Sequence, residues 1–154
     1  MIPSSAADLE LLAMHLRIDS IEHALRAIGQ GDGPGGYLAA YAVAEDNLRL
    51  GHAVVADCVN PLAITRQAWR DAAARAGARI VELEVICSDP GEHRRRVEER
   101  APDLPGQRLP TWAGVQARAV ERWDRATMRI DTAGQSLDGC VARVLAALNP
   151  AALD

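Results

Sequence analysis

Short apolar segments alternate along this chain with longer segments in which apolar residues recur every three or four positions. Four of the short segments are rich in Val, Ile or Leu and predict strands, at Met14–Ile18, Ala53–Cys58, Arg79–Cys87 and Met128–Asp131. Strands that alternate with helices pair in parallel through right-handed crossovers. The pattern therefore predicts an α/β fold built on a parallel sheet.

The helical segments differ in how much apolar surface they offer. Helices are predicted at Ser20–Ile28, Tyr37–Leu48, Ile64–Ala76, Trp112–Trp123 and Leu137–Leu148, and a further one starts after Ser88 or Asp89 as N-cap. The last of these has the clearest apolar stripe. The helix in SDPGEHRRRVEER has almost none, because Val97 stands nearly alone among Arg and Glu. Such a helix is typical of a solvent-exposed element or of a lid.

Composition narrows the function. A length of 154 residues favours a single domain, 1–154, and a net charge of −4 argues against general nucleic-acid binding. No apolar run is long enough to cross a bilayer and the start lacks a signal-peptide pattern, so we expect a cytoplasmic protein without membrane partners. All 17 basic residues are Arg. Chemistry that needs a lysine amine is therefore excluded from these residues.

Neither cysteine nor histidine predicts a metal centre by spacing. The three cysteines lie far apart without a CxxC pair and are expected to be buried small residues. His15, His23, His52 and His93 share no ligand spacing, so we expect ordinary surface or core histidines.

Two carboxylates are the main candidates for chemistry. Asp19 and Asp57 end the first and second predicted strands, and ligands of parallel sheets bind at the carboxyl ends of the strands. One carboxylate there can take a proton from a hydroxyl, while a second holds Mg²⁺ through its waters. Alternatively, Asp19 caps the following helix and Asp57 caps a turn before Asn60–Pro61. Position alone leaves both interpretations open.

Two further motifs have a plain alternative. The loop GQGDGPGG, Gly29–Gly36, resembles a phosphate cradle, but it follows a helix and lacks a Lys, so a connecting loop is favoured. The run Glu92–Arg100 can supply guanidinium groups to a polyphosphate. It can equally be a solvated helix face held by i,i+4 pairs such as Glu92 with Arg96.

The order of these segments resembles the small P-loop kinases of the AAA-family ATPase-like group, which includes zeta toxins, chloramphenicol phosphotransferase and polynucleotide 5′-kinase. The resemblance covers about His15 to Leu148, through HLRIDSIEHALR, AVAEDNLRLGHAVVADCVNP, ELEVICSDPGEHRRRVEER, LPTWAGV and RIDTAGQSLDGCVARVLAAL. It implies a three-layer sandwich with a parallel sheet of the P-loop NTPase type. It also implies ATP and Mg²⁺ as cofactors and a small-molecule hydroxyl as phosphoryl acceptor.

The resemblance also implies roles for individual residues. Asp19 would act as the base and Asp57 would bind Mg²⁺. A lid-like segment, 88–113, would carry phosphate-binding arginines. The segment DTAGQS, with Asp131 and Thr132, would lie near the adenine. The expected lid arginines are Arg94, Arg95, Arg96 and Arg100.

The resemblance lacks its donor side. Such kinases begin with a strand and GxxxxGK[ST], whereas MIPSSAADLELLAM stands here and no Lys exists. We therefore expect a truncated or degenerate kinase homologue without its first strand. A non-catalytic ligand- or partner-binding protein on the same scaffold is the alternative, and an unrelated flavodoxin-like regulator is a third interpretation.

Loss of a central strand would leave two open inner sheet edges. We expect the gap to close by direct pairing of Ala53–Cys58 with Arg79–Cys87, or by strand completion in a homodimer. A third route would draw in Ile2–Leu12, although Ala6–Ala13 favours a helix.

Overall fold

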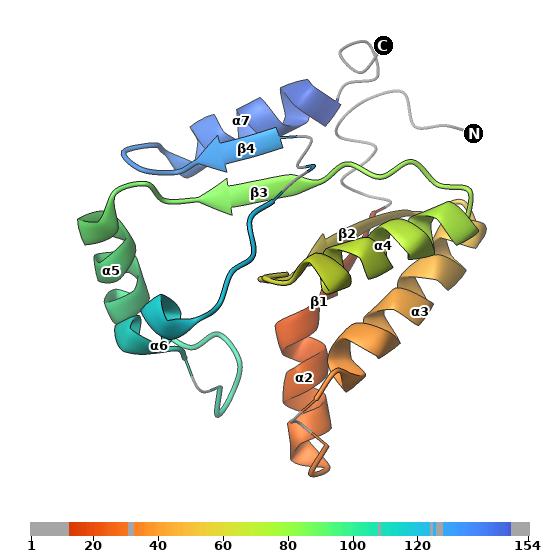
Figure 1. The fold of residues 1–154 in the computed structure, drawn as a ribbon, viewed down its shortest axis with the longest axis horizontal. Helices are drawn as coiled ribbons and strands as arrows, with labels where there is room; N and C mark the ends of the chain where they lie inside the picture. Colours follow the sequence, from red (N-terminus) through yellow and green to blue (C-terminus); the bar gives the residue numbers. More distant parts are fainter. Residues whose placement is uncertain (1–12, 31–32, 108, 124, 126–127, 149–154) are drawn as a thin grey trace. The chain divides into compact units, whose positions relative to one another are not determined.

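The computed structural model describes residues 13–30, 33–107, 109–123, 125 and 128–148. In these ranges strands and helices alternate, which confirms the α/β class (Figure 1). The strands are β1 (Ala13–Arg17), β2 (Ala53–Asp57), β3 (Leu83–Ile86) and β4 (Met128–Asp131). The helices are α2 (Ile18–Ala27), α3 (Gly35–Arg49), α4 (Ala63–Arg75), α5 (Pro90–Glu99), α6 (Trp112–Ala117) and α7 (Leu137–Leu148).

The chain divides into two compact units. Unit 1 comprises Met1–Ile80 and Ala119–Glu121, and unit 2 comprises Val81–Arg118 and Arg122–Asp154. Each unit contains one parallel two-stranded sheet, β1 with β2 in unit 1 and β3 with β4 in unit 2. None of the helices in the described ranges combines the length and apolar character that crossing a bilayer requires.

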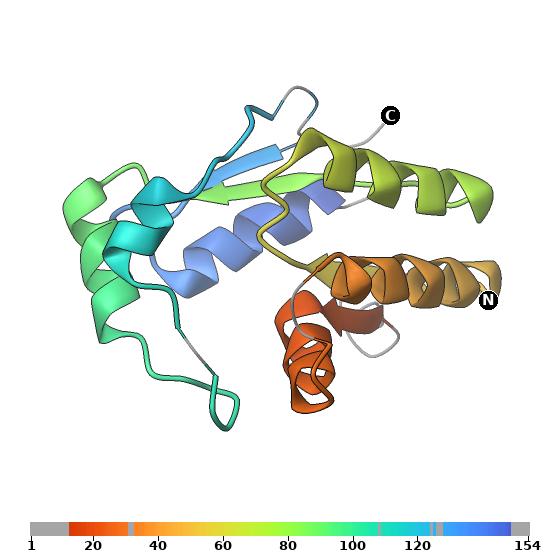
Figure 2. The same ribbon diagram turned by 60° about the horizontal axis from the view of Figure 1, so that its bottom comes forward.

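Unit 1 is built around a buried apolar cluster. Leu16 and Ile18 point from β1 and the start of α2 toward Ala40 and Ala44 of α3, and Trp69 of α4 completes the cluster. Alanines at these positions let the helix backbone approach the sheet closely, since they occupy little space. Helices α3 and α4 run side by side, as Figure 2 shows.

A turn held by side chains follows β2. Asn60 has a left-handed backbone conformation with φ of 48°, and its N–H donates to the Tyr37 hydroxyl at 3.2 Å. The Asn60 carbonyl accepts from Nη1 of Arg66 at 3.1 Å, and the Arg66 side chain is fully buried. These bonds fix the path of the chain from the end of β2 into α4.

Unit 2 begins its helices with side-chain caps. Asp89 caps α5 by accepting from the Glu92 N–H at 2.8 Å, with Pro90 in the first turn. Thr111 caps α6 through the Gly114 N–H at 3.1 Å. Ser136 accepts from the Gly139 N–H at 3.1 Å at the start of α7, as the sequence predicts.

Two predictions for the later part of the chain are wrong. The helix expected over Trp112–Trp123 ends at Ala117, because Arg118 has extended backbone and Ala119–Glu121 joins unit 1. The expected pairing of Ala53–Cys58 with Arg79–Cys87 is absent among the described residues. There, β2 uses β1 as its parallel partner and β3 uses β4. The segment Ile2–Leu12 lies outside the described residues, and Ala13 begins β1.

Candidate functional site

Asp19 and Asp57 lie at one edge of the unit 1 sheet. The parallel register places Arg17 opposite Asp57, the last residue of β2, and Asp19 follows Arg17 in the first turn of α2. Both carboxylates remain accessible, with 48% and 57% of their side-chain surface exposed. The structure therefore brings the two predicted catalytic residues to the same carboxyl edge.

Each of the two carboxylates has a basic neighbour. His15 Nε2 lies 3.3 Å from Asp57 Oδ2. His15 is paired with Val55, and Asp57 lies two residues further along β2, on the same face of the sheet. Arg17 Nη2 lies 3.7 Å from Asp19 Oδ2. The N-cap of α2 is Arg17, which makes no side-chain cap bond, so Asp19 contributes to this helix only as an acid in its first turn. Its carboxylate stays open to a ligand on the exposed side.

Cys58, Tyr37 and Tyr41 pack against the buried cluster of unit 1, and Asp57 and Asp19 are close enough to affect the Cys58 thiol. Burial raises the pKa of the Cys58 thiol to about 11, and the negative charges of Asp57 and Asp19 add to the rise. Burial also raises the pKa of Tyr37 and of Tyr41 to about 12, with the Cys58 thiol as a further cause. At neutral pH the three groups are therefore uncharged.

The metal expected from the resemblance fits this edge only through water. Within the described residues there is no group of three His, Cys, Asp or Glu side chains that could hold an ion. A single exposed carboxylate matches the way Mg²⁺ keeps most of its water shell and takes one or two protein oxygens. Asp57 is the residue that would hold it.

The remaining predicted residues belong to unit 2. Arg96 of α5 donates to Thr132 twice, to Oγ1 at 2.7 Å and to the backbone carbonyl at 3.0 Å. Asp131 Oδ1 accepts from the N–H groups of Ser88 and Ala133, each at 3.0 Å, and hydrogen bonds from these two residues lower its pKa. Three of the predicted nucleotide-binding residues therefore meet at the carboxyl ends of β3 and β4.

These polar groups already bond to one another. Arg96 also pairs with Glu92, whose second oxygen accepts from the Gly134 N–H at 2.9 Å. Further along α5, Arg94 pairs with Glu98 at 2.9 Å and Arg95 with Glu99 at 4.0 Å. This is the i,i+4 pattern of the alternative interpretation, a solvated helix face. Three of the four expected lid arginines are therefore engaged with glutamates.

The glycine-rich loop connects α2 to α3, as the sequence favours, with Gly29 and Gly33 at positive φ. Residues 31 and 32 lie outside the described residues. Gly36 is required for packing, because a Cβ there would approach Glu22 Cγ to 2.6 Å.

Spacing along the sequence did not identify some residues that shape these sites. Metal-ligand spacing does not connect His15 to Asp57, which is 42 positions away. Its signal is the strand pattern itself, since His15 and Asp57 occupy the polar face of neighbouring strands. Glu121 had no signal, although its Oε2 accepts from the Ala63 N–H at 2.6 Å across 58 positions.

Comparisons of the chain with protein-family models, with curated proteins and with solved structures found no match. The resemblance to P-loop kinases therefore stays a prediction.

Proposed function

We propose that this chain carries the acceptor side of an ATP-dependent kinase for small-molecule hydroxyls and that these 154 residues alone do not turn over. The observation that carries the proposal is the parallel register of β1 and β2. It places two exposed carboxylates, Asp19 and Asp57, at one carboxyl edge. The layered P-loop arrangement is part of the same proposal.

The chemistry assigned to this edge is proton transfer and positioning. Asp19 accepts a hydrogen bond from the acceptor hydroxyl and takes its proton as that oxygen becomes a nucleophile. Arg17 at 3.7 Å and the first turn of α2 orient the carboxylate. Asp57, with His15 Nε2 at 3.3 Å, would hold hydrated Mg²⁺, and the ion would supply charge neutralisation. Phosphoryl transfer itself would require the lysine of a P-loop, and the sequence contains no Lys.

A metal titration tests the role of Asp57. Mn²⁺, a paramagnetic substitute for Mg²⁺, should broaden the amide NMR signals of residues 15–19 and 55–58. Asp57→Asn should remove this broadening. Asp71→Asn is the matched control, because Asp71 is an exposed carboxylate on α4 that accepts from Gln67 Nε2 at 2.8 Å. Equal broadening in the wild type and in Asp57→Asn would contradict the assignment.

Calorimetry tests the missing donor side. We expect no saturable binding of ATP·Mg²⁺ at millimolar concentration, which corresponds to about −4 kcal/mol. Micromolar binding would overturn this part of the proposal.

A non-catalytic binding protein is the second candidate, and the pairing of Arg94, Arg95 and Arg96 with glutamates favours it. A fusion separates the two. If a preceding segment supplies a strand and GxxxxGK[ST], the kinase proposal predicts phosphoryl transfer that Asp19→Asn abolishes while ATP binding persists. If the chain is a binding protein, we expect no phosphoryl transfer, whether the fusion carries Asp19 or Asp19→Asn.

A further inference from the structure

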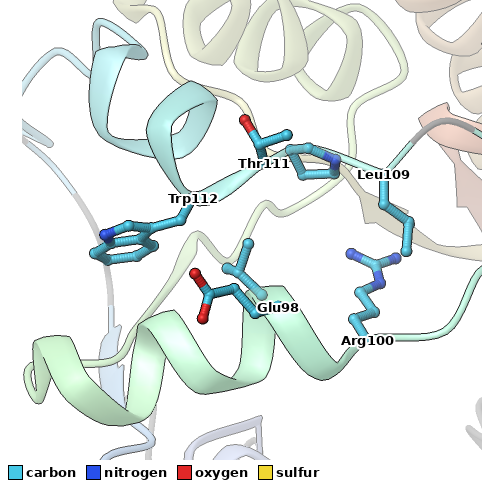
Figure 3. Close-up of a pocket in the computed structure, with 7 residues that line it drawn as sticks. Glu98, Arg100, Leu109, Thr111 and Trp112 are labelled. Carbon is cyan, nitrogen blue, oxygen red and sulfur yellow. The ribbon is translucent and has the colours of Figure 1, made fainter.

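Unit 2 contains a pocket that the proposed acceptor chemistry does not use. The C-terminal turn of α5 forms one wall, and Leu109–Trp112 forms the other (Figure 3). The pocket is open on one side and has a volume of about 380 Å³, which suits a small organic molecule. Val97, the one aliphatic residue of the polar helix α5, lines this pocket.

The walls combine an apolar middle with charged ends. Val97, Leu109, Pro110 and Trp112 supply the apolar surface. Figure 3 shows Glu98 near the Trp112 end and Arg100 beneath Leu109 at the other. The Trp112 ring is braced by His93 in an edge-to-face contact, with centroids 5.2 Å apart at 83°. A held indole is a preorganised surface for another planar group.

The two charged ends differ in what they offer a ligand. Glu98 is engaged with Arg94 at 2.9 Å, which offsets its charge. Arg100 follows the last turn of α5 with extended backbone, and among the described residues its guanidinium has no ion-pair or hydrogen-bond partner. The pocket therefore has one open cationic group, with the planar fork that binds carboxylate or phosphate.

We propose that this pocket binds a small aromatic molecule with one anionic group, placing the ring against Trp112 and Val97 and the anion on Arg100. A carboxylate and a phosphate share this chemistry. The site uses neither Asp19 nor Asp57, but it does use Arg100, one of the four arginines that the kinase resemblance assigns to the lid.

Titration of the ¹⁵N-labelled protein tests the site, followed at the Trp112 indole N–H after assignment with Trp112→Phe. Phenyl phosphate and benzoate are the probes, and whichever binds tighter identifies the anion. Benzyl alcohol and inorganic phosphate, which each lack one half of the recognition, should bind at least about tenfold more weakly than the better probe. Benzylamine binding as tightly as that probe would show Glu98 to be the recognition group and would overturn the proposal.

Variants on α5 complete the test. Arg100→Gln should weaken binding of the better probe about tenfold, and Arg100→Lys should recover part of it, because charge returns without the fork. Arg95→Gln is the matched control, since Arg95 is on the same helix, pairs with Glu99 and does not line the pocket. An Arg100→Gln variant that binds like the wild type would refute the site, as would a Trp112 signal that no probe moves.

Discussion

Unit 1 and unit 2 hold their strands in place by different means. In unit 1, Leu16, Ile18 and Trp69 are buried against the small alanines of α3. In the described part of unit 2, Ile130 and Cys140 alone are buried apolar residues, whereas Val85 is 62% and Leu137 78% exposed. Between α7 and the β3–β4 sheet lies an apolar groove of about 250 Å³.

Polar bonds replace apolar packing at the ends of β3 and β4. Arg96 binds Thr132, Asp131 accepts from two backbone N–H groups, and Glu92 links α5 to Gly134. Apolar burial responds weakly to pH and salt, while exposed polar bonds respond strongly. The difference implies that the buried cluster of unit 1 keeps its geometry under conditions that disturb the polar contacts of unit 2.

The largest effect should follow from removing the aromatic ring at the centre of unit 1. Trp69→Ala should lower the free energy of unfolding of unit 1 by about 3–5 kcal/mol, because it leaves a cavity behind Leu16 and Tyr41. Urea denaturation measures it. Ile64→Ala on the same helix is the control, since Ile64 is 75% exposed and should change stability by less than about 0.5 kcal/mol. Equal losses in both variants would remove the distinction between the units.

A smaller effect should come from the cap of α5 in unit 2. Asp89→Ala removes the acceptor for the Glu92 N–H and should cost about 1 kcal/mol of local stability. Faster amide hydrogen exchange through α5 measures the loss. Glu99→Ala at the exposed end of the helix is the control and should leave exchange unchanged. Unchanged protection from exchange in Asp89→Ala would mean that other contacts of unit 2 stabilise α5.

Acid should disturb unit 2 through Asp131. Hydrogen bonds from Ser88 and Ala133 hold the pKa of Asp131 below its usual value of 3.8. A lowered folded-state pKa adds stability above the unfolded-state pKa, and that stability is lost as pH falls through the folded value. The Ser88 and Ala133 amide signals should therefore shift together below pH 3.8. In Asp131→Asn this common transition should be missing, and its persistence would exclude Asp131 as the cause.

The smallest effect concerns reactivity alone. Because burial raises the pKa of Cys58 to about 11, only about 0.1% of it is thiolate at pH 8. Iodoacetamide labelling of Cys58, followed by peptide mass spectrometry, should rise about tenfold per pH unit from pH 7 to 10. Labelling in urea is the control, because unfolding exposes Cys58, and its rate should already be high near pH 8. A labelling rate that levels off near pH 9 would contradict the raised pKa of Cys58 and its burial in unit 1.

Strand and helix positions were largely readable from the sequence where apolar periodicity is strong. The strand at Met128–Asp131 and the helix at Leu137–Leu148 have the expected bounds. The strand predicted at Arg79–Cys87 is shorter, because only Leu83–Ile86 find partners on β4. Helix α6 ends early because Glu121 bonds to Pro61 and Ala63, and a long-range contact of this kind leaves no periodic trace.

The candidate sites were predictable to a similar degree. Strand-end position identified Asp19 and Asp57, since parallel strands bring their carboxyl ends together. The run of arginines was correctly placed on a helix, but its intrahelical pairs could not be distinguished from phosphate ligands by sequence. The pocket beside Arg100 has no sequence signal, because Val97 and Trp112 lie on different elements and no local pattern records their approach.

The contact between Glu121 and α4 also affects how the chain is made. Leu62 precedes α4 without a side-chain cap, so the Ala63 N–H depends on a carboxylate 58 positions later. At about 5–20 residues per second, a ribosome would need about 3–12 s to add that residue after Ala63. During this interval the Ala63 N–H at the start of the nascent helix can bond only to water. Unit 1 acquires the hydrogen bonds to Glu121 only when much of unit 2 has already been synthesised.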